Sequence, residues 1–296
     1  MSIFTSLQLR LFQYTHYMFT AFLAAVSIGI ADAFSKYAVM RLKTGRLMVI
    51  SGIIQLALNF AFFLTMKGSF PAGIILLKLS LVQIVSTLAY LLYIIALLHG
   101  NVSILTAILS ASSIFSVVLG IIVLGEKISV PQAIGVLLII AGSIGISFDG
   151  KTAEEDKKKR ILWLTLTIAA TILWGVWAFL SKVVLSEVKP YELSFFNSLL
   201  SFILLTPYFI SAVRKEKDAI VNFKSVSVAV LFASLVASGL MLFYYSATKI
   251  PISLASPIFC TSPLVTAIMS AFMFKERLQI HQYISLFVII LSMFLL

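Results

Sequence analysis

Long apolar runs constrain the fold of this chain more than any other feature of its sequence. Ten stretches of mostly apolar residues follow one another, most of them separated by short polar connections. About 20 such residues in a helix cross the roughly 30 Å hydrocarbon core of a bilayer. Because a helix satisfies its backbone polar groups within one segment, it is the form that such runs adopt in lipid. The sequence therefore predicts an all-α integral membrane protein with ten transmembrane helices.

The composition supports lipid as the solvent. Of the 296 residues, 61% are hydrophobic and 11% are charged, whereas about 25% are charged in a typical soluble domain. A soluble chain has to cover its surface with polar groups, and this chain has too few of them. We expect the spans to occupy Tyr17–Met40, Leu47–Met66, Ala72–Leu98, Ser103–Leu124, Gln132–Phe148, Ile161–Leu185, Glu192–Val213, Val226–Thr248, Ser253–Phe274 and Gln282–Leu296.

The net charge of +11 is concentrated in short loops between the apolar runs. Most Lys and Arg residues lie in alternate loops, and such a surplus is the signal of cytoplasmic loops in membrane proteins. The pattern places the central linker inside and both termini outside. Because membrane spans separate the basic loops, we expect no nucleic-acid partner. The predicted partners are the lipid bilayer and a small-molecule substrate.

Cysteine and histidine are too scarce and scattered for a metal or disulfide site. Cys260 is the single cysteine, and the three histidines lie far apart in the sequence. The HExxH pattern, the nucleophile elbow and the Walker motif do not occur in the sequence. We therefore predict no cofactor, no metal and no catalytic residue, and we expect neither an enzyme nor an ATP-driven pump.

The two halves of the sequence are related. The first repeat is predicted at residues 17–148, a charged linker (DGKTAEEDKKKR) at residues 149–160 and the second repeat at residues 161–296. Identical residues recur in the same order, separated by 146 or 150 positions: Gly29 and Gly175, Ser35 and Ser181, Lys36 and Lys182, Ser103 and Ser253, Glu126 and Glu276.

An odd number of helices in each half gives the repeats opposite orientations in the membrane. Inverted repeats place the substrate site of a transporter near the bilayer midplane, where the repeats meet, and they allow two related states that open to opposite sides. The sequence therefore favours a transporter with alternating access. The alternatives are a membrane-embedded enzyme and a duplicated scaffold that transports nothing.

Short patterns in both halves resemble the EamA family of the drug/metabolite transporter superfamily. The resemblance covers residues 20–296. It implies a ten-helix fold whose central cavity is lined mainly by helices 1, 3 and 4 and by helices 6, 8 and 9. It also implies export or exchange of amino acids, related metabolites or drugs. The patterns are Gly29…Lys36, Trp174-Gly175…Lys182, Ala96-Leu97, Ser262-Pro263-Leu264, Lys275-Glu276-Arg277, and Gly125-Glu126-Lys127 with Gly135 and Gly142.

Three features depart from the family pattern. Ser113 stands where the family commonly has proline, and Ser27-Ile28 replaces the usual Leu-Trp before Gly29. Members of the family are usually described with cytoplasmic termini, which conflicts with the distribution of basic loops. The orientation of the chain in the membrane therefore stays open.

Ionisable residues within the spans are candidate functional groups, because burying a charge in lipid is costly. Asp32 lies about 22 Å into its span at 1.5 Å per residue, and a carboxyl group that exchanges a proton at that depth would suit proton coupling. The alternative is a structural pair with Lys36, which follows on the same helical face. Lys36 and Lys182 occupy equivalent places in the repeats. They either bind an anionic part of the substrate or extend to the lipid headgroups.

Aromatic and amide side chains are the other candidates for substrate binding. Trp174, Trp177, Tyr93 and Tyr244 are placed to line a cavity or to bind a cation by their ring faces. The alternative for each of them is the interfacial aromatic belt or helix packing. Amides in the middle of spans either contact the substrate or form hydrogen bonds between helices: Gln55, Asn59 and Asn197.

Residues at the ends and breaks of helices are interpreted structurally. Glu126 and Glu276 follow the fourth and ninth spans and are expected to form helix caps or surface ion pairs. Pro257 and Pro263 interrupt the ninth span. Each proline removes an intrahelical hydrogen bond and frees a carbonyl, so both are hinge candidates.

These observations together predict a secondary transporter, an exporter or exchanger of small metabolites such as amino acids or amphipathic compounds. Ten helices are sufficient to enclose a cavity, so we expect a monomer. The predicted location is the plasma membrane, as a multi-pass protein, with a bacterial inner membrane as the specific expectation.

Overall fold

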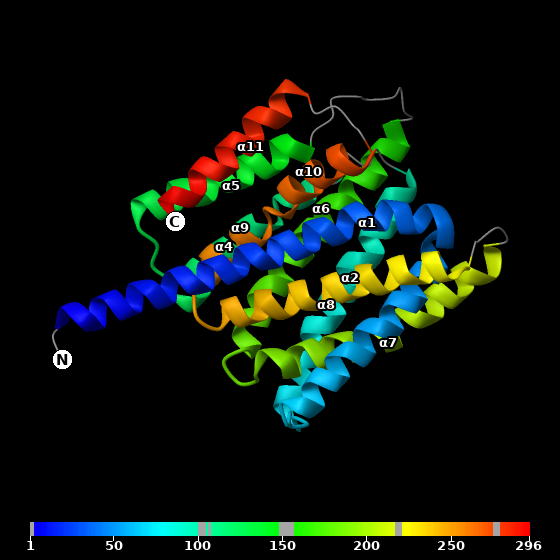
Figure 1. Cartoon of the computed structure of the whole chain (residues 1–296), viewed down its shortest axis with the longest axis horizontal. Helices are drawn as coiled ribbons and strands as arrows, with labels where there is room; N and C mark the ends of the chain where they lie inside the picture. The colour runs from blue at the N-terminus through cyan, green and yellow to red at the C-terminus, as the bar shows by residue number, and fades with distance from the viewer. Residues whose placement is uncertain (1–2, 100–104, 106–107, 148–156, 217–220, 275–278) are drawn as a thin grey trace.

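The computed structural model describes residues 3–99, 105, 108–147, 157–216, 221–274 and 279–296. All regular secondary structure in these ranges is helical, as Figure 1 shows. The elements are α1 (Ile3–Thr65), α2 (Ile74–His99), α4 (Ser112–Leu124), α5 (Val130–Ser147), α6 (Lys157–Val184), α7 (Pro190–Lys215), α8 (Phe223–Ala247), α9 (Ile252–Phe259), α10 (Ser262–Phe274), α11 (Ile280–Ser292) and the 3-10 turn η1 (Met293–Leu295).

The long element α1 consists of two spans joined by a kink. Residues Tyr14–Val39 and Arg41–Thr65 are each long and apolar enough to cross a bilayer. The chain turns at Lys43, near the start of the second span, where φ is 61° and ψ is 165°, and Figure 1 shows the second span turning back from the first. A positive φ is uncommon for a residue with a Cβ. The carboxylate of Glu216 stabilises this turn by accepting a hydrogen bond from the backbone N–H of Gly45 at 2.7 Å.

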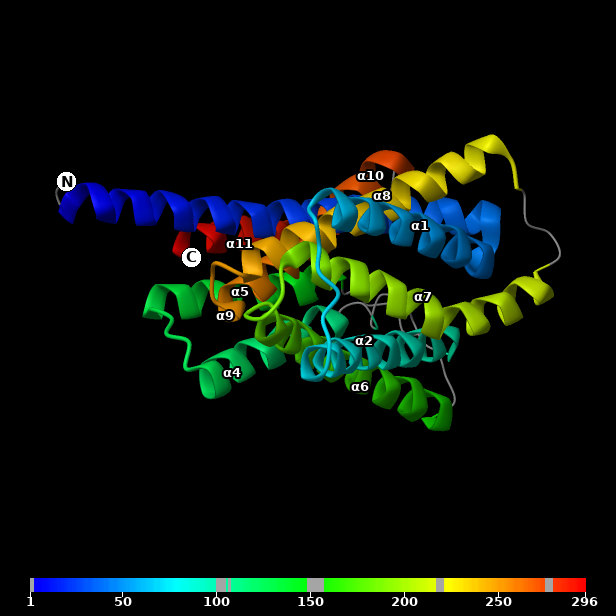
Figure 2. The ribbon, with the colours of Figure 1, turned by 90° about the horizontal axis from the view of Figure 1, so that it is seen from below.

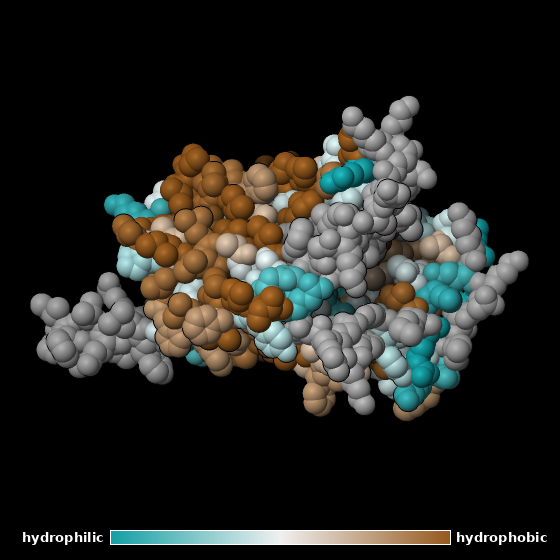
Figure 3. Space-filling model, turned by 90° about the horizontal axis from the view of Figure 1, so that it is seen from above, coloured by the Kyte–Doolittle hydropathy of each residue, from teal (hydrophilic) through white to brown (hydrophobic). Residues whose placement is uncertain are grey.

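Seven helices in the described part of the chain are long and apolar enough to span a membrane, and three shorter apolar helices accompany them. The outer surface carries large apolar side chains, such as Phe272, which is 84% exposed. Figure 3 shows apolar surface over the middle of the molecule and hydrophilic residues gathered at its right-hand end. Soluble monomers rarely expose apolar surface of this extent. The chain is therefore a multi-pass membrane protein, while the count of ten spans stays a prediction.

Helices of one repeat pack along helices of the other. In Figure 1, α5 lies along α11, and α1 lies along α8. Figure 2 shows α2 beside α6, the pair that corresponds to α8 and α1 when the two repeats are exchanged. The packing of α5 on α11 depends on a glycine, because a Cβ at Gly142 would lie 2.6 Å from Cγ1 of Ile289. This contact explains structurally why the sequence pattern places Gly142 in the span after Glu126.

The predicted interruption of the ninth span is present in the structure. The helix α9 ends at Phe259, and α10 begins two residues after Cys260. The first repeat is interrupted in the same way at Ala111, which is 150 positions before Thr261. Ser113 replaces proline in that repeat, so the break forms without a proline beside it. The hinge role of Pro257 and Pro263 stays a prediction.

Glu126 connects the two repeats. Its carboxylate accepts hydrogen bonds from the backbone N–H groups of Ile252 at 2.7 Å and Ser253 at 2.9 Å. These are the first residues of α9, whose N–H groups have no partner within the helix. The cap interpretation of Glu126 is therefore confirmed, and the capped helix belongs to the other repeat. Glu276 lies outside the described residues.

Further polar contacts join the repeats near the same end of the bundle. The carboxylate of Glu192, at the start of α7, accepts hydrogen bonds from the backbone N–H and the hydroxyl of Ser69 at 2.9 and 2.8 Å. Nearby, Lys78 of α2 forms an ion pair with Glu187. The contact of Glu216 lies at the opposite end of α7. The two repeats are thus linked at both ends of the helices.

Candidate substrate cavity

A polar cavity of about 340 Å³ lies inside the bundle. Both repeats form its walls: the two spans of α1 and the helix α2 from the first, and α6, α7 and α8 from the second. Polar side chains inside a membrane protein face a partner or a water-filled space, because lipid does not solvate them. The polar residues that line it are Asp32, Ser35, Ser51, Gln55, Asn59, Gln83, Ser86, Thr87, Ser194, Asn197, Ser198, Ser201 and Thr206.

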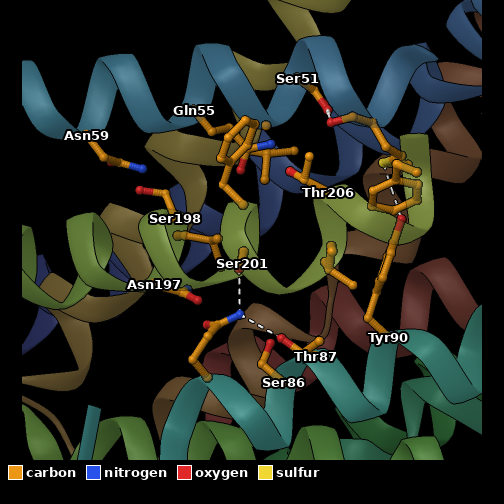
Figure 4. Close-up of a pocket in the computed structure, with 18 of the residues that line it drawn as sticks. Ser51, Gln55, Asn59, Ser86, Thr87, Tyr90, Asn197, Ser198, Ser201 and Thr206 are labelled. Carbon is orange, nitrogen blue, oxygen red and sulfur yellow. Dashed lines mark hydrogen bonds between the residues drawn. The ribbon is translucent and has the colours of Figure 1, made fainter. Parts of the chain in front are cut away.

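The polar wall is built from stripes at helical spacing. Ser51, Gln55 and Asn59 are four residues apart in the second span of α1 and therefore share one face. Figure 4 shows this stripe at the top, polar residues of α7 below it and those of α2 at the bottom. The lining extends along α7 from Ser194 to Phe209, about 22 Å at 1.5 Å per residue. The cavity therefore extends along much of α7, with polar side chains distributed over its length.

Asp32 faces this cavity from the first span of α1. The residue is exposed although it lies within a span, because it borders the cavity. The Ser35 hydroxyl donates a hydrogen bond to the backbone carbonyl of Asp32 at 2.7 Å, and not to its carboxylate. The Lys36 side chain, predicted either to pair with Asp32 or to bind substrate, lies outside the described side chains.

Aromatic side chains surround one part of the cavity. Tyr93 of α2 and Trp174 of α6 both line it, with their ring centroids 5.5 Å apart. Tyr90 lies next to Tyr93, and its hydroxyl donates to the Met48 sulfur at 3.2 Å, as Figure 4 shows. Ring faces in such a position bind apolar groups or cations.

Gln83 is the most buried amide of the cavity wall. Its Nε2 donates hydrogen bonds to the hydroxyls of Thr87 at 3.1 Å and Ser201 at 2.5 Å, drawn as dashed lines in Figure 4. The residue is 2% exposed, and its Oε1 has no hydrogen-bond partner among the described residues. A buried acceptor without a donor is costly, so this oxygen is a candidate contact for a bound molecule or water.

Asn197 of α7, in the cavity wall, is hydrogen-bonded to Tyr244 of α8. The Asn197 Nδ2 donates to the Tyr244 hydroxyl at 2.6 Å. Asn197 lines the cavity, whereas Tyr244 is fully buried behind it and does not belong to the lining. Tyr244 therefore orients the amide of Asn197 and does not itself face the cavity.

Two more of the predicted binding residues lie away from the cavity lining. The ammonium of Lys182 donates to the backbone carbonyls of Ala247 at 2.5 Å and Ile250 at 3.0 Å, at the end of α8. Cations commonly satisfy the last carbonyls of a helix in this way. Trp177 is 8% exposed and stacks on Phe243 at 5.9 Å. Both side chains therefore contribute to packing between α6 and α8.

The helices around the cavity differ from those that the family resemblance implies. The implied lining used helices 4 and 9, but the described residues of α4, α9 and α10 provide none of the lining. Their surfaces are occupied by mutual packing, which includes a hydrogen bond from the Ser116 hydroxyl to Ser256 at 2.7 Å. The second span of α1 and α7 take their place, with Gln55 and Ser198 among the polar residues that face the cavity.

The polar lining residues of α2 and most of those of α7 are not among the candidates that the sequence predicts. Their spacing is the signal that would have found them, because Gln83 and Thr87 recur on one helical face, as do Asn197 and Ser201. Single serines and threonines in membrane helices also bond to their own backbone, which is why each one alone carries little information.

The sequence pattern of the EamA-like transporter family matches residues 15–148 and again residues 161–296. The chain belongs to this family. The two matches cover most of the sequence and correspond to its two related halves.

Two relatives match parts of the chain. The chain is 23% identical over 180 residues to the uncharacterized transporter YetK of Bacillus subtilis, a match that covers 60% of this chain and 54% of YetK. The chain therefore spans about half the length of that relative. It is 26% identical over 136 residues to the uncharacterized protein MJ1333.1 of Methanocaldococcus jannaschii, which covers 45% of this chain and 94% of MJ1333.1.

A crystal structure of a protein with 13% sequence identity superposes with a TM-score of 0.77. The superposition covers 95% of this chain and 97% of the other. At this level of identity the similarity concerns the fold alone. A multi-pass membrane transporter is thus the functional class that the family and the YetK relative support.

Proposed function

We propose that the chain is a secondary transporter that exports or exchanges small polar metabolites through the central cavity. The observation that carries this proposal is the polar cavity of about 340 Å³ inside an apolar bundle. A volume of this size suits a metabolite, since ligand pockets typically measure about 300–1,000 Å³. Residues with polar side chains within membrane spans mark substrate pathways.

Alternating access between the repeats is the proposed mechanism. The cavity lies between helices of both repeats, where inverted-repeat transporters bind their substrates. The contacts of Glu126 and Glu192 join the repeats at one end, and that of Glu216 joins them at the other. Breaking one set of contacts while keeping the other would open the cavity to one side at a time.

Amino acids are the leading substrate class for export or exchange, and Asp32 is the proposed proton-coupling group. Asp32 lines the cavity, and a carboxyl group that faces both a substrate site and water is able to bind a proton in one state and release it in the other. The plasma membrane is the proposed location.

Counterflow in proteoliposomes tests the function. Vesicles that contain the purified chain are loaded with an unlabelled metabolite, and uptake of the same labelled compound is followed for a broad panel. We expect counterflow of at least one small polar compound. The variant Ser201→Trp, which fills the cavity, should abolish it, whereas Ile122→Trp on the exposed surface of α4 should not.

Absence of counterflow for every compound of the panel would contradict the transporter proposal and favour a scaffold. Equal activity of the Ser201→Trp and Ile122→Trp proteins would show that the substrate does not pass through this cavity. Reconstitution of both variants is checked by their amount in the vesicles, so that a loss of flux reports transport.

A further inference from the structure

Three serine hydroxyls of the cavity lining, those of Ser35, Ser51 and Ser198, present oxygen lone pairs to its interior. The hydroxyl of Ser35 donates to the backbone carbonyl of Asp32 at 2.7 Å, and that of Ser51 donates to the carbonyl of Met48 at 3.2 Å. The Ser198 hydroxyl likewise donates to a backbone carbonyl of its own helix, at 2.9 Å. Each of these hydroxyls has one proton and two lone pairs. With the proton engaged, the group acts toward a ligand as an acceptor.

The amides of the deep wall have the same bias. Both donor bonds of the Gln83 Nε2 go to protein hydroxyls, and its buried Oε1 has no partner among the described residues. Asn197 directs its Nδ2 toward Tyr244 at 2.6 Å, so its Oδ1 is the atom left for a ligand. A primary amide offers two N–H donors and one oxygen acceptor. In these two amides the donors are largely used within the protein, and the oxygens remain.

The charge of the cavity also favours a ligand that is cationic and donates hydrogen bonds. Among the described residues that line the cavity, Asp32 is the only one with a charged side chain. Lys182, the described lysine that the sequence suggested for an anionic substrate, is bound to two backbone carbonyls outside the lining. Within the described lining, a carboxylate or phosphate ligand would meet Asp32 and the amide oxygens of Gln83 and Asn197 without a matching cation.

We propose that the cavity selects organic ammonium compounds that carry several N–H donors, in preference to carboxylates and other anions. The inference rests on the transporter function proposed above and narrows its substrate class from amino acids to amines that lack a carboxylate. The Asp32 carboxylate receives the ammonium group, with Tyr93 and Trp174 beside it along the lining. Further N–H or O–H groups of the substrate donate to Gln83 Oε1 and Asn197 Oδ1.

Two further amides of the cavity lining are able to bind the neutral part of such a substrate. Gln55 and Asn59 line the opposite wall, and within the described part of the chain both their donors and their acceptors are available to a ligand. They suit hydroxyl or amide groups, which are donors and acceptors at once. An amino alcohol or a diamine of moderate length fits this arrangement better than a dicarboxylate.

A matched series of four-carbon compounds tests the proposal by binding, without requiring transport. The probes are 1,4-diaminobutane, 4-aminobutanoate, butane-1,4-diol and succinate, titrated calorimetrically into the purified full chain in detergent. We expect 1,4-diaminobutane to bind at least tenfold more tightly than succinate. Permethylation of its two nitrogens removes every N–H donor and should weaken binding about tenfold, although the charge is unchanged.

Single-residue variants test whether 1,4-diaminobutane binds in this cavity. Asp32→Asn keeps the size of the side chain and removes its charge, so it should weaken binding of 1,4-diaminobutane at least tenfold and leave butane-1,4-diol unchanged. Gln83→Met removes the free amide oxygen and should weaken binding of 1,4-diaminobutane by a smaller factor than Asp32→Asn does. Glu187→Gln removes the same charge from the exposed ion pair with Lys78 and should have no effect. Thermal unfolding of each variant establishes that it is folded.

Three outcomes overturn the inference. Succinate that binds as tightly as 1,4-diaminobutane, or a diamine whose binding is the same in Asp32→Asn, would show that the cavity does not select ammonium donors. Absence of binding by all four compounds would also reject this substrate class. Each of these results leaves the transporter function in place as long as counterflow with another metabolite is observed. Loss of counterflow for the whole panel is the separate failure of that function.

Discussion

Gly29 and Gly175 make the same contact in the two repeats, each with the matching turn of the opposite repeat. A Cβ at Gly29 would lie 2.6 Å from the backbone oxygen of Ser262, and a Cβ at Gly175 would lie 2.4 Å from that of Ser112. The two serines are 150 positions apart, and the two glycines are 146 positions apart. The internal repeat in the sequence is therefore a repeat of packing, in which a helix of each half closes on the broken helix of the other.

A side chain at either glycine position should destabilise the protein. Gly29→Ala and Gly175→Ala each place a methyl group against backbone, and overpacking of this kind costs about 1–3 kcal/mol. We expect each variant to unfold at a lower temperature in detergent, as followed by tryptophan fluorescence. Ala141→Val, which adds bulk on the exposed side of α5, is the control. Full stability of both glycine variants would contradict the close approach of these helices.

Loss of the Glu126 carboxylate should destabilise α9 and the link between the repeats. Glu126→Gln keeps the size of the side chain but weakens two charge-assisted hydrogen bonds to Ile252 and Ser253. Such bonds contribute about 1.5–3 kcal/mol each, so thermal unfolding should shift clearly downward. Glu187→Gln, which breaks a partly exposed ion pair, should change stability by less than about 1 kcal/mol. An equal shift for both variants would show that Glu126 is no more than a surface charge.

Asp32→Asn should separate coupling from transport. If the carboxylate carries the proton, the variant loses its response to a pH gradient across the vesicle, and exchange without a gradient is measured at substrate concentrations high enough to offset the weaker binding expected of this variant. Ser35→Ala changes a neighbouring lining residue without altering the charge and should keep the response. A pH response in Asp32→Asn equal to that of the unchanged protein would exclude this role for Asp32.

Substitution of Lys182 should affect stability more than substrate affinity. Its ammonium donates to two carbonyls at the end of α8 and does not line the cavity. We expect Lys182→Met to lower the unfolding temperature, because two acceptors lose their donor, and to leave the Kd of a transported compound unchanged. A large rise in Kd at unchanged stability would instead support the substrate-binding role that the sequence suggested.

Cysteine labelling in cells should decide the orientation. The distribution of basic loops predicts that the loop before α5 is outside and that the start of α8 is in the cytoplasm. In a Cys260→Ser background, cysteine at exposed Ser129 should react with an impermeant thiol reagent on intact cells. Cysteine at exposed Lys224 should react only after permeabilisation. The reverse pattern would place the termini in the cytoplasm.

The sequence by itself determined the membrane class, the helical fold and the relation between the halves. These properties depend on local composition and length: an apolar run such as Phe223–Ala247 has one way to satisfy its backbone in lipid. The spacing of Gly29 and Gly175 likewise indicated two equivalent helix contacts, which the structure contains. The prolines around Cys260 indicated the break between α9 and α10.

Only the tertiary structure decided which polar residues meet. Helical periodicity shows that Gln83 and Thr87 share a face, but the rotation and neighbours of α2 determine that this face meets Ser201. The same reason separates Trp174, which lines the cavity, from Trp177, three residues further along α6, which is buried against Phe243. Packing between distant segments sets these directions, and no local pattern in the chain encodes them.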